Sequence, residues 1–107
     1  MAKQPPFAIS FADSTLDHLS AIDTKYHGLV AESIESQLSH HPHIETKNRK
    51  SLRLPAPFDA TWELRCGPQN RFRVLYSFEL DSRCVIIKGI CVKEGNRLIC
   101  GGEEVGP

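Results

Sequence analysis

Residues 62–78 read WELRCGPQNRFRVLYSF, and the alternation of side chains in this stretch decides the fold. Two runs alternate apolar and polar residues with a period of two, which is typical of a half-buried strand. Trp62 and Leu64 share one face of the first run, and Phe72, Val74 and Tyr76 share one face of the second. The GPQN segment between the runs has the composition of a turn. The stretch therefore predicts an antiparallel hairpin with one buried face.

The opposite face of this hairpin is mainly basic, although the chain has no net charge. It carries Glu63, Arg65, Arg71 and Arg73. Residues 47–76 hold seven basic and two acidic residues, a local charge of +5. Such an asymmetry indicates a surface that binds an anion. A solvated basic face without a ligand is the alternative.

Two further patterns precede the hairpin. Residues Phe7–Ala12 alternate as a short strand does, and apolar residues then recur at helical spacing from Leu16 to Leu38. This span predicts either one bent helix or two helices that break near Asp23–Thr24. Residues 40–60, rich in basic residues and proline, predict an extended basic loop.

The predicted sheet continues after the hairpin. Its strands are Thr61–Cys66, Arg71–Leu80 and Cys84–Val92, and the near-continuous apolar run of the third indicates a central, buried position. The turn Lys93–Arg97 leads into a short fourth strand, and we expect residues 101–107 to be loose.

These elements predict one domain over residues 1–107 with an α+β fold. One strand and one or two helices precede a three- to four-stranded antiparallel meander. The helices pack on one face of the sheet and leave the other face open. The hairpin arginines project from that open face.

The sequence carries no marks of a membrane or secreted protein. No apolar run approaches the roughly 18 residues that span a bilayer, and MAKQPPFAIS does not have the pattern of a secretory signal. Of the four cysteines, no two are spaced as C-x-x-C, so we expect no metal site. The chain is therefore expected in the cytoplasm, with its cysteines reduced.

Four motifs follow one another in a familiar order: QLSHHPHIETKNRKSL, WELR with RFRVLY close behind, VIIKGICVKEG, and NRLICGGEEV. Their order and spacing resemble the RelE/ParE superfamily of prokaryotic type II toxin–antitoxin toxins, from about Phe7 to Val105. The resemblance implies a RelE/ParE-like toxin held inactive by an antitoxin from a neighbouring gene. It implies either a RelE-like enzyme that cleaves mRNA in the ribosome or a ParE-like inhibitor of DNA gyrase.

The resemblance also suggests roles for the basic face, without any cofactor. Arg73 matches the arginine that recurs in the active strand of the family, and Arg65 lies across the hairpin from it. Arginine suits a scissile phosphate because its planar fork binds phosphate at two points and stays charged. Glu63 is a candidate general base and, equally, a structural partner of an arginine. Contacts to the RNA backbone are expected from Lys47, Arg49, Lys50, Arg53, Arg71, Lys93 and Arg97.

The chain also departs from the best-known nuclease of that family. Thr61 and Glu63 stand where that nuclease has lysines, and the ending GGEEVGP leaves no room for its C-terminal helix. Both departures favour the binding-only alternative, in which the chain is a gyrase inhibitor or an inactive relative that binds its antitoxin. The basic run from Lys47 to Arg53 beside the arginine strand favours the nuclease, which is the function we predict. The histidines of HHPH (residues 40–43) are a further source of acid–base groups, although histidines at a helix end more often contact its last carbonyls.

Overall fold

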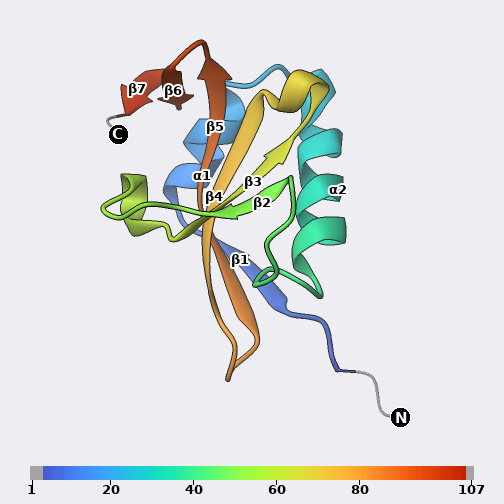
Figure 1. Cartoon of the computed structure of the whole chain (residues 1–107). Helices are drawn as coiled ribbons and strands as arrows, with labels where there is room; N and C mark the ends of the chain where they lie inside the picture. Colours follow the sequence, from blue (N-terminus) through green and yellow to red (C-terminus); the bar gives the residue numbers. More distant parts are fainter. Residues whose placement is uncertain (1–3, 106–107) are drawn as a thin grey trace.

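The computed structural model describes residues 4–105 of the chain, in which seven strands form one mixed sheet (Figure 1). Helices α1 and α2 lie between the first two strands. No helix in the described range is long and apolar enough to cross a membrane. In chain order the elements are β1 (Ala8–Phe11), α1 (Ser14–Ser20), α2 (His27–Leu38), β2 (Arg49–Ser51), β3 (Trp62–Cys66), β4 (Phe72–Glu79), β5 (Cys84–Glu94), β6 (Arg97–Cys100) and β7 (Glu103–Val105).

The sheet confirms the expected fold class and adds strands to it. Its order is β2-β3-β4-β5-β6-β7, with antiparallel neighbours throughout, and β1 pairs in parallel with β5. Strand β5 has the central position that its apolar run indicated. Of the two alternatives for the helical span, the structure has two helices, because a short 3-10 turn at Thr24–Tyr26 separates α1 from α2. Strands β2 and β7 were not expected.

The main core lies between α2 and the sheet. Val30, Ile34 and Leu38 are spaced by four residues, so they share one face of α2, and all three are buried. They belong to one cluster with Leu64 of β3 and Tyr76 of β4. This confirms the apolar face of the hairpin as the buried face.

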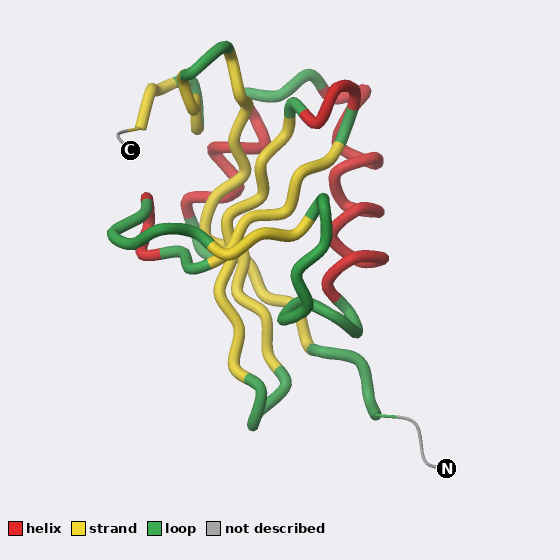
Figure 2. Tube along the Cα trace, in the orientation of Figure 1, coloured by secondary structure: helices red, strands yellow, loops and turns green. Residues whose placement is uncertain are grey.

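The other face of the sheet is partly covered, which corrects the expectation of an open face. Figures 1 and 2 show α2 on one side of the strands, and the loop between β2 and β3 on the other side together with β6 and β7. A second, smaller core lies there, because apolar residues of the loop and of the last strands fold back onto the sheet. Its buried members are Ala60, Leu75, Cys91 and Cys100, with Leu52, Leu98 and Val105 packed against them.

Residues Arg97–Val105 form a hairpin of β6 and β7, which we call the C-terminal hairpin. The tail was expected to be loose, whereas residues 103–105 pair with β6. Gly101 and Gly102 make the turn with φ of 63° and 81°, a conformation that favours glycine. Residues 106 and 107 lie outside the described range.

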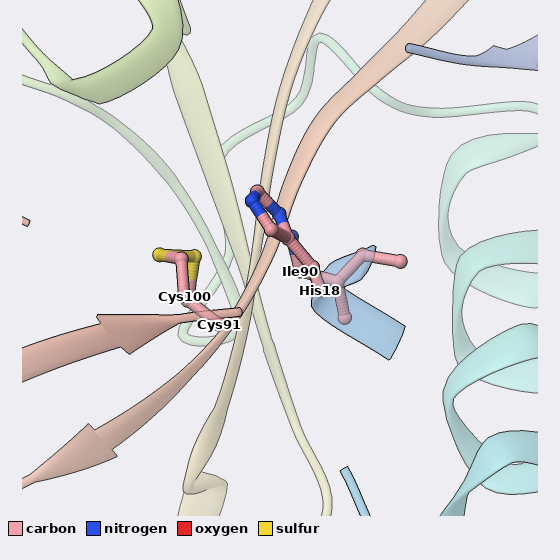
Figure 3. The surroundings of a disulfide bond; sticks show 4 residues. All are labelled: His18, Ile90, Cys91 and Cys100. Carbon is pink, nitrogen blue, oxygen red and sulfur yellow. A yellow bond between two sulfur atoms is a disulfide. The ribbon is translucent and has the colours of Figure 1, made fainter. Parts of the chain in front are cut away.

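Cys91 and Cys100 form a disulfide, so the expectation of reduced cysteines is wrong for this pair (Figure 3). They are nine residues apart in sequence, but the β5–β6 register sets them directly opposite each other with their Cα atoms 4.3 Å apart. This separation is typical of a non-hydrogen-bonded antiparallel pair and lies within reach of a disulfide. Cys66 and Cys84 are free thiols, as expected.

One edge of β5 is shared by two strands from opposite ends of the chain. β1 pairs with Cys84–Ile87, and β6 pairs with Cys91–Glu94. The gap between them is bridged by His18 of α1, whose Nδ1 accepts a hydrogen bond of 3.2 Å from the backbone N–H of Ile90. Figure 3 shows the His18 ring beside Ile90, close to the disulfide. The side chain thus substitutes for one missing strand contact.

Candidate functional site

Arg65 and Arg73 lie directly opposite each other on β3 and β4. Because strand residues alternate between faces, both side chains project from the sheet face opposite α2, together with Glu63. The next residue across the sheet from Arg73 is Cys91 of β5. We call this side of the sheet the arginine face. The sequence correctly placed Glu63, Arg65 and Arg73 on it.

Glu63 joins the two arginines. It is only 8% exposed, and its Oε1 accepts hydrogen bonds from Arg65 Nε at 2.8 Å and from an Arg73 guanidinium nitrogen at 3.4 Å. A second bond holds Arg73, whose Nε donates to the Asn70 carbonyl at 3.1 Å. The geometry therefore makes Glu63 a partner that orients the guanidinium groups of Arg65 and Arg73.

The electrostatics of Arg73 reflect this environment. The side chain is only 15% exposed. Burial lowers the pKa of Arg73, the carboxylate of Glu63 raises it, and the positive charge of Arg65 lowers it again. An arginine stays charged under such shifts. Arg73 is thus a fixed and partly dehydrated cation, which interacts more strongly with a phosphate than a fully solvated one.

Two predicted RNA contacts extend the arginine face. Lys50 of β2 pairs with Glu63 in the β2–β3 register, so it stands on the same face as the arginines. Lys93 follows Cys91 by two residues on β5 and by alternation projects from this face as well. The face therefore carries Lys50 and Lys93 in addition to the two arginines that contact the buried carboxylate of Glu63.

Arg49 has a different role from the one expected. It is only 9% exposed, and its guanidinium donates to the Ile44 carbonyl at 2.9 Å and to the Gln37 side chain at 2.6 Å. Its position opposite Leu64 turns it toward the α2 side of the sheet. All of these contacts lie within the protein, so Arg49 fastens the basic loop to α2 and is unavailable to RNA.

Arg71 also lies apart from the other arginines. It precedes β4, and its guanidinium stacks over the Phe72 ring at 5.8 Å from the centroid. It borders a hollow that Lys25 and Tyr26 also line, on the α2 side of the sheet. The alternation that placed Arg71 with Arg73 fails because β4 begins only at Phe72.

The remaining predicted RNA contacts are exposed. Lys47 and Arg53 lie on the basic loop, on either side of β2. Arg97 begins the C-terminal hairpin and forms an exposed ion pair with Glu104 at 3.5 Å. None of the three contacts the arginine pair through an ion pair or hydrogen bond within residues 4–105. They are accessible to a long ligand.

A hollow of about 340 Å³ borders the arginine face where the basic loop approaches the C-terminal hairpin. Pro57 lines it from the loop, Lys93 from β5, and Leu98 and Val105 from the hairpin. Of the segments that form its walls, the basic loop and residues 101–105 were expected to be irregular, whereas the short strand that carries Leu98 was expected. The disulfide ties one of these walls to β5. The spacing of the two cysteines gave no sign of this role.

The histidines of the HHPH run lie elsewhere. His40, His41 and His43 border a separate hollow with Asp81 and Arg83, beside the turn that follows β4. Arg73 lies near the opposite end of the same strand. Within residues 4–105, no three His, Cys, Asp or Glu side chains are grouped as a bound metal ion would require.

Comparison with solved structures supports the fold. No family model matches the chain, and no curated protein matches it either. Among solved structures, the fold is similar to that of a chain in the crystal structure of the toxin–antitoxin complex RelBE2 from Mycobacterium tuberculosis. The TM-score is 0.67 at 22% sequence identity, and the match covers 87% of this chain and 98% of that one. The protein therefore has the RelE-like fold that its sequence motifs predicted.

Proposed function

We propose that the chain is the toxin of a type II toxin–antitoxin system and that it is a RelE-like, metal-independent endoribonuclease. Its substrate is mRNA on the ribosome, its products are two mRNA fragments, and the cleavage blocks translation. The RelE-like fold, shared with a protein of a toxin–antitoxin complex, supports the toxin assignment. A cognate antitoxin and a cytoplasmic location belong to the same proposal.

The opposed pair of Arg65 and Arg73 is the observation that carries the nuclease proposal. Cleavage without a metal uses the ribose 2′-OH as nucleophile, which attacks the neighbouring phosphorus and expels the 5′ oxygen of the next nucleotide. The phosphorane that forms on the way carries extra negative charge, and fixed cations at its oxygens lower the barrier. Two guanidinium groups held by one carboxylate are already oriented for this task.

The contacts of Glu63 favour a second function. Its carboxylate is shared between two arginines, and the histidines lie beside the far end of β4. A phosphate-binding face whose buried carboxylate is already paired with two arginines suits a toxin that acts by binding, as an inhibitor of DNA gyrase does. An inactive relative that only binds its antitoxin would have the same surface.

A reconstituted bacterial translation system that contains the protein and a defined mRNA tests the nuclease. We expect the wild-type chain to cut the mRNA only when ribosomes are present, and Arg73→Ala to lower the cleavage rate by about 100-fold or more. Arg73→Lys keeps the charge but loses the planar fork, so we expect an intermediate rate. Lys25→Ala removes one exposed cation outside the arginine face and serves as the control.

Intact mRNA in every reaction would refute the nuclease. A supercoiling assay with purified DNA gyrase then tests the alternative. If the wild-type protein inhibits supercoiling and leaves RNA intact, the binding function is established in place of the nuclease.

The antitoxin proposal has its own experiment. We expect a short gene beside this one to encode an acidic protein that binds the arginine face. Co-expression should restore growth and yield a complex whose stability falls steeply with ionic strength, since charge pairing is screened by salt. If the protein encoded by the neighbouring gene does not bind the purified chain, the antitoxin proposal is refuted.

A further inference from the structure

The disulfide belongs to the row of residues that crosses the arginine face. Across four neighbouring strands, Arg73 is paired with Cys91, Cys91 with Cys100, and Cys100 with Glu103. The bonded sulfurs therefore lie between Arg73 and the outer strand of the C-terminal hairpin. Both cysteines are buried, with Cys91 fully excluded from solvent. A change at this bond acts directly beside the proposed phosphate site.

The bond is one of few attachments of the C-terminal hairpin. β6 pairs with only four residues of β5, and β7 pairs only with β6. Two further contacts hold the hairpin: Leu98 and Val105 pack in the small core, which includes Leu75, and Gly101 at its turn lies against His18 of α1. Leu75 follows Arg73 by two residues on the same face of β4. Loosening the hairpin therefore opens the apolar surroundings of Arg73.

We propose that the Cys91–Cys100 disulfide is a redox switch that controls phosphate binding on the arginine face. In the oxidised protein the C-terminal hairpin is fixed as a wall of the hollow, and the arginine face is preorganised for a phosphate backbone. In the reduced protein the wall is loose, and binding must first order it, which weakens affinity. The inference rests on the proposed function for its ligand, and on the strand register for its mechanism.

The switch needs a dithiol reductant of the thioredoxin or dithiothreitol class. One thiolate of the reductant attacks Cys100 Sγ, and the sulfur of Cys91 leaves as a thiolate that takes up a proton. The second thiol of the reductant then attacks the mixed disulfide and releases Cys100 as a thiol. Two electrons and two protons have moved to the protein, and the reductant leaves as a cyclic disulfide. Because both sulfurs are buried, the first attack requires a transient opening of the hairpin.

The test compares oxidised and dithiothreitol-reduced wild-type protein in two measurements. The first is amide hydrogen exchange, in which we expect faster exchange on reduction in residues 97–105 and an unchanged rate in α2. The second is the affinity for a fluorescent single-stranded RNA at fixed ionic strength. We expect reduction to weaken binding by about fivefold or more, the lower end of typical coupling between two sites.

Variants separate the switch from general effects of thiols. Cys91→Ser/Cys100→Ser should bind as the reduced protein does and should not respond to dithiothreitol. Cys84→Ser removes a free, partly exposed cysteine and should respond as the wild type does. Reduced wild-type protein gives the same information without any substitution if the double variant fails to fold.

The two measurements fail independently. If reduction speeds exchange in the hairpin but the protein binds RNA in neither redox state, the proposed ligand is refuted, and the switch on RNA binding with it. The conclusion that the disulfide holds the C-terminal hairpin in place would remain. RNA binding that is equal or tighter after reduction overturns the switch and leaves the proposed function intact. An unchanged exchange rate in residues 97–105 after reduction would show that the disulfide does not hold the hairpin, and would overturn the switch.

Discussion

Arg65 and Arg73 lie directly opposite each other across the β3–β4 ladder, and the single carboxylate of Glu63 contacts both. Like charges in directly opposed positions destabilise a sheet. Here the buried carboxylate offsets their repulsion and holds both guanidinium groups in place. The arrangement is stable while its carboxylate is present, and it retains an excess of positive charge for an anionic ligand.

Glu63→Gln keeps the shape of the side chain and removes its charge. We expect the free energy of unfolding to fall by about 1–3 kcal/mol in urea denaturation, since two cations lose the negative charge that pairs with them. The exposed Glu104→Gln, which loses only its surface pair with Arg97, should change stability by less than about 0.5 kcal/mol.

The same Glu63→Gln variant distinguishes the two roles of this residue. If Glu63 orients the arginines, RNA cleavage should stay within about tenfold of the wild type. A loss of about 100-fold or more with little change in stability would make it the general base instead. The measurement is single-turnover cleavage in the presence of ribosomes.

Arg49→Met should destabilise the chain without a direct effect on RNA binding. The substitution keeps an unbranched apolar stem but leaves the carbonyl of Ile44 and the amide of Gln37 without their donor. We expect a loss of about 1–3 kcal/mol in urea denaturation. Lys47→Met, at an exposed position of the same loop, should leave stability within about 0.5 kcal/mol. If Arg49→Met weakens RNA binding without a change in stability, Arg49 contacts the RNA directly.

His18 makes stability depend on pH. Burial lowers the pKa of His18 below its ordinary value of 6.5, and Asp17 raises it in part. The unfolded chain therefore takes up a proton before the folded one as the pH falls, so stability is full above pH 6.5 and is lost as the pH falls through the folded pKa. Protonation of Nδ1 also removes the acceptor of the Ile90 N–H. Urea denaturation at pH 7.5 and pH 5 should show this loss.

His18→Asn is the matched variant for this prediction. Its side-chain oxygen can accept the same hydrogen bond but does not titrate in this range. We expect a lower stability at all pH values because volume is lost, with a smaller difference between pH 7.5 and pH 5. His41→Asn changes an exposed histidine and should keep the wild-type difference. An equal pH effect in the wild type and in His18→Asn would assign the dependence to another group.

Gly89→Ala should displace the basic loop from the sheet. A Cβ at this position would lie 2.9 Å from a ring carbon of Phe58, so the ring and the loop that carries it must move. We expect a loss of about 1–3 kcal/mol, typical of overpacking, and a change in the chemical shifts of Phe58. Gly28→Ala, with nothing within 4 Å of the added carbon, should be neutral or gain up to about 1 kcal/mol in α2.

The regular parts of the fold could be predicted because each has a periodic pattern. Alternation identified β3 and β4, and the four-residue spacing of Val30, Ile34 and Leu38 identified α2. The position of Arg65 and Arg73 on one face follows from the same period of two. Strands β2 and β7 have three residues each, too few for a pattern to be visible. Their position depends on partners that are remote in sequence or held by a disulfide.

The candidate site was predicted in part for a related reason. Periodicity tells which face a residue occupies, but not how deeply it is buried. Arg49 and Lys50 are neighbours in one basic run, yet one is fastened to α2 and the other stands beside Glu63. The difference arises because successive residues of β2 face opposite sides of the sheet, and this three-residue strand was not recognised in the sequence. The cysteine pair escaped prediction because opposition across a hairpin depends on its register, which the spacing of nine residues does not reveal.

The shared edge of β5 makes the two ends of the chain structurally interdependent. β1 protects the backbone of one half of that edge, and β6 protects the other half. A protein shortened by the C-terminal hairpin would present unpaired N–H and C=O groups at residues 91–94, and such an edge recruits strands from other molecules. Truncation at either end should therefore convert a discrete molecule into one that self-associates through its central strand. An intact chain, with any affinity tag joined through a flexible spacer, keeps this edge of β5 paired and so prevents such association.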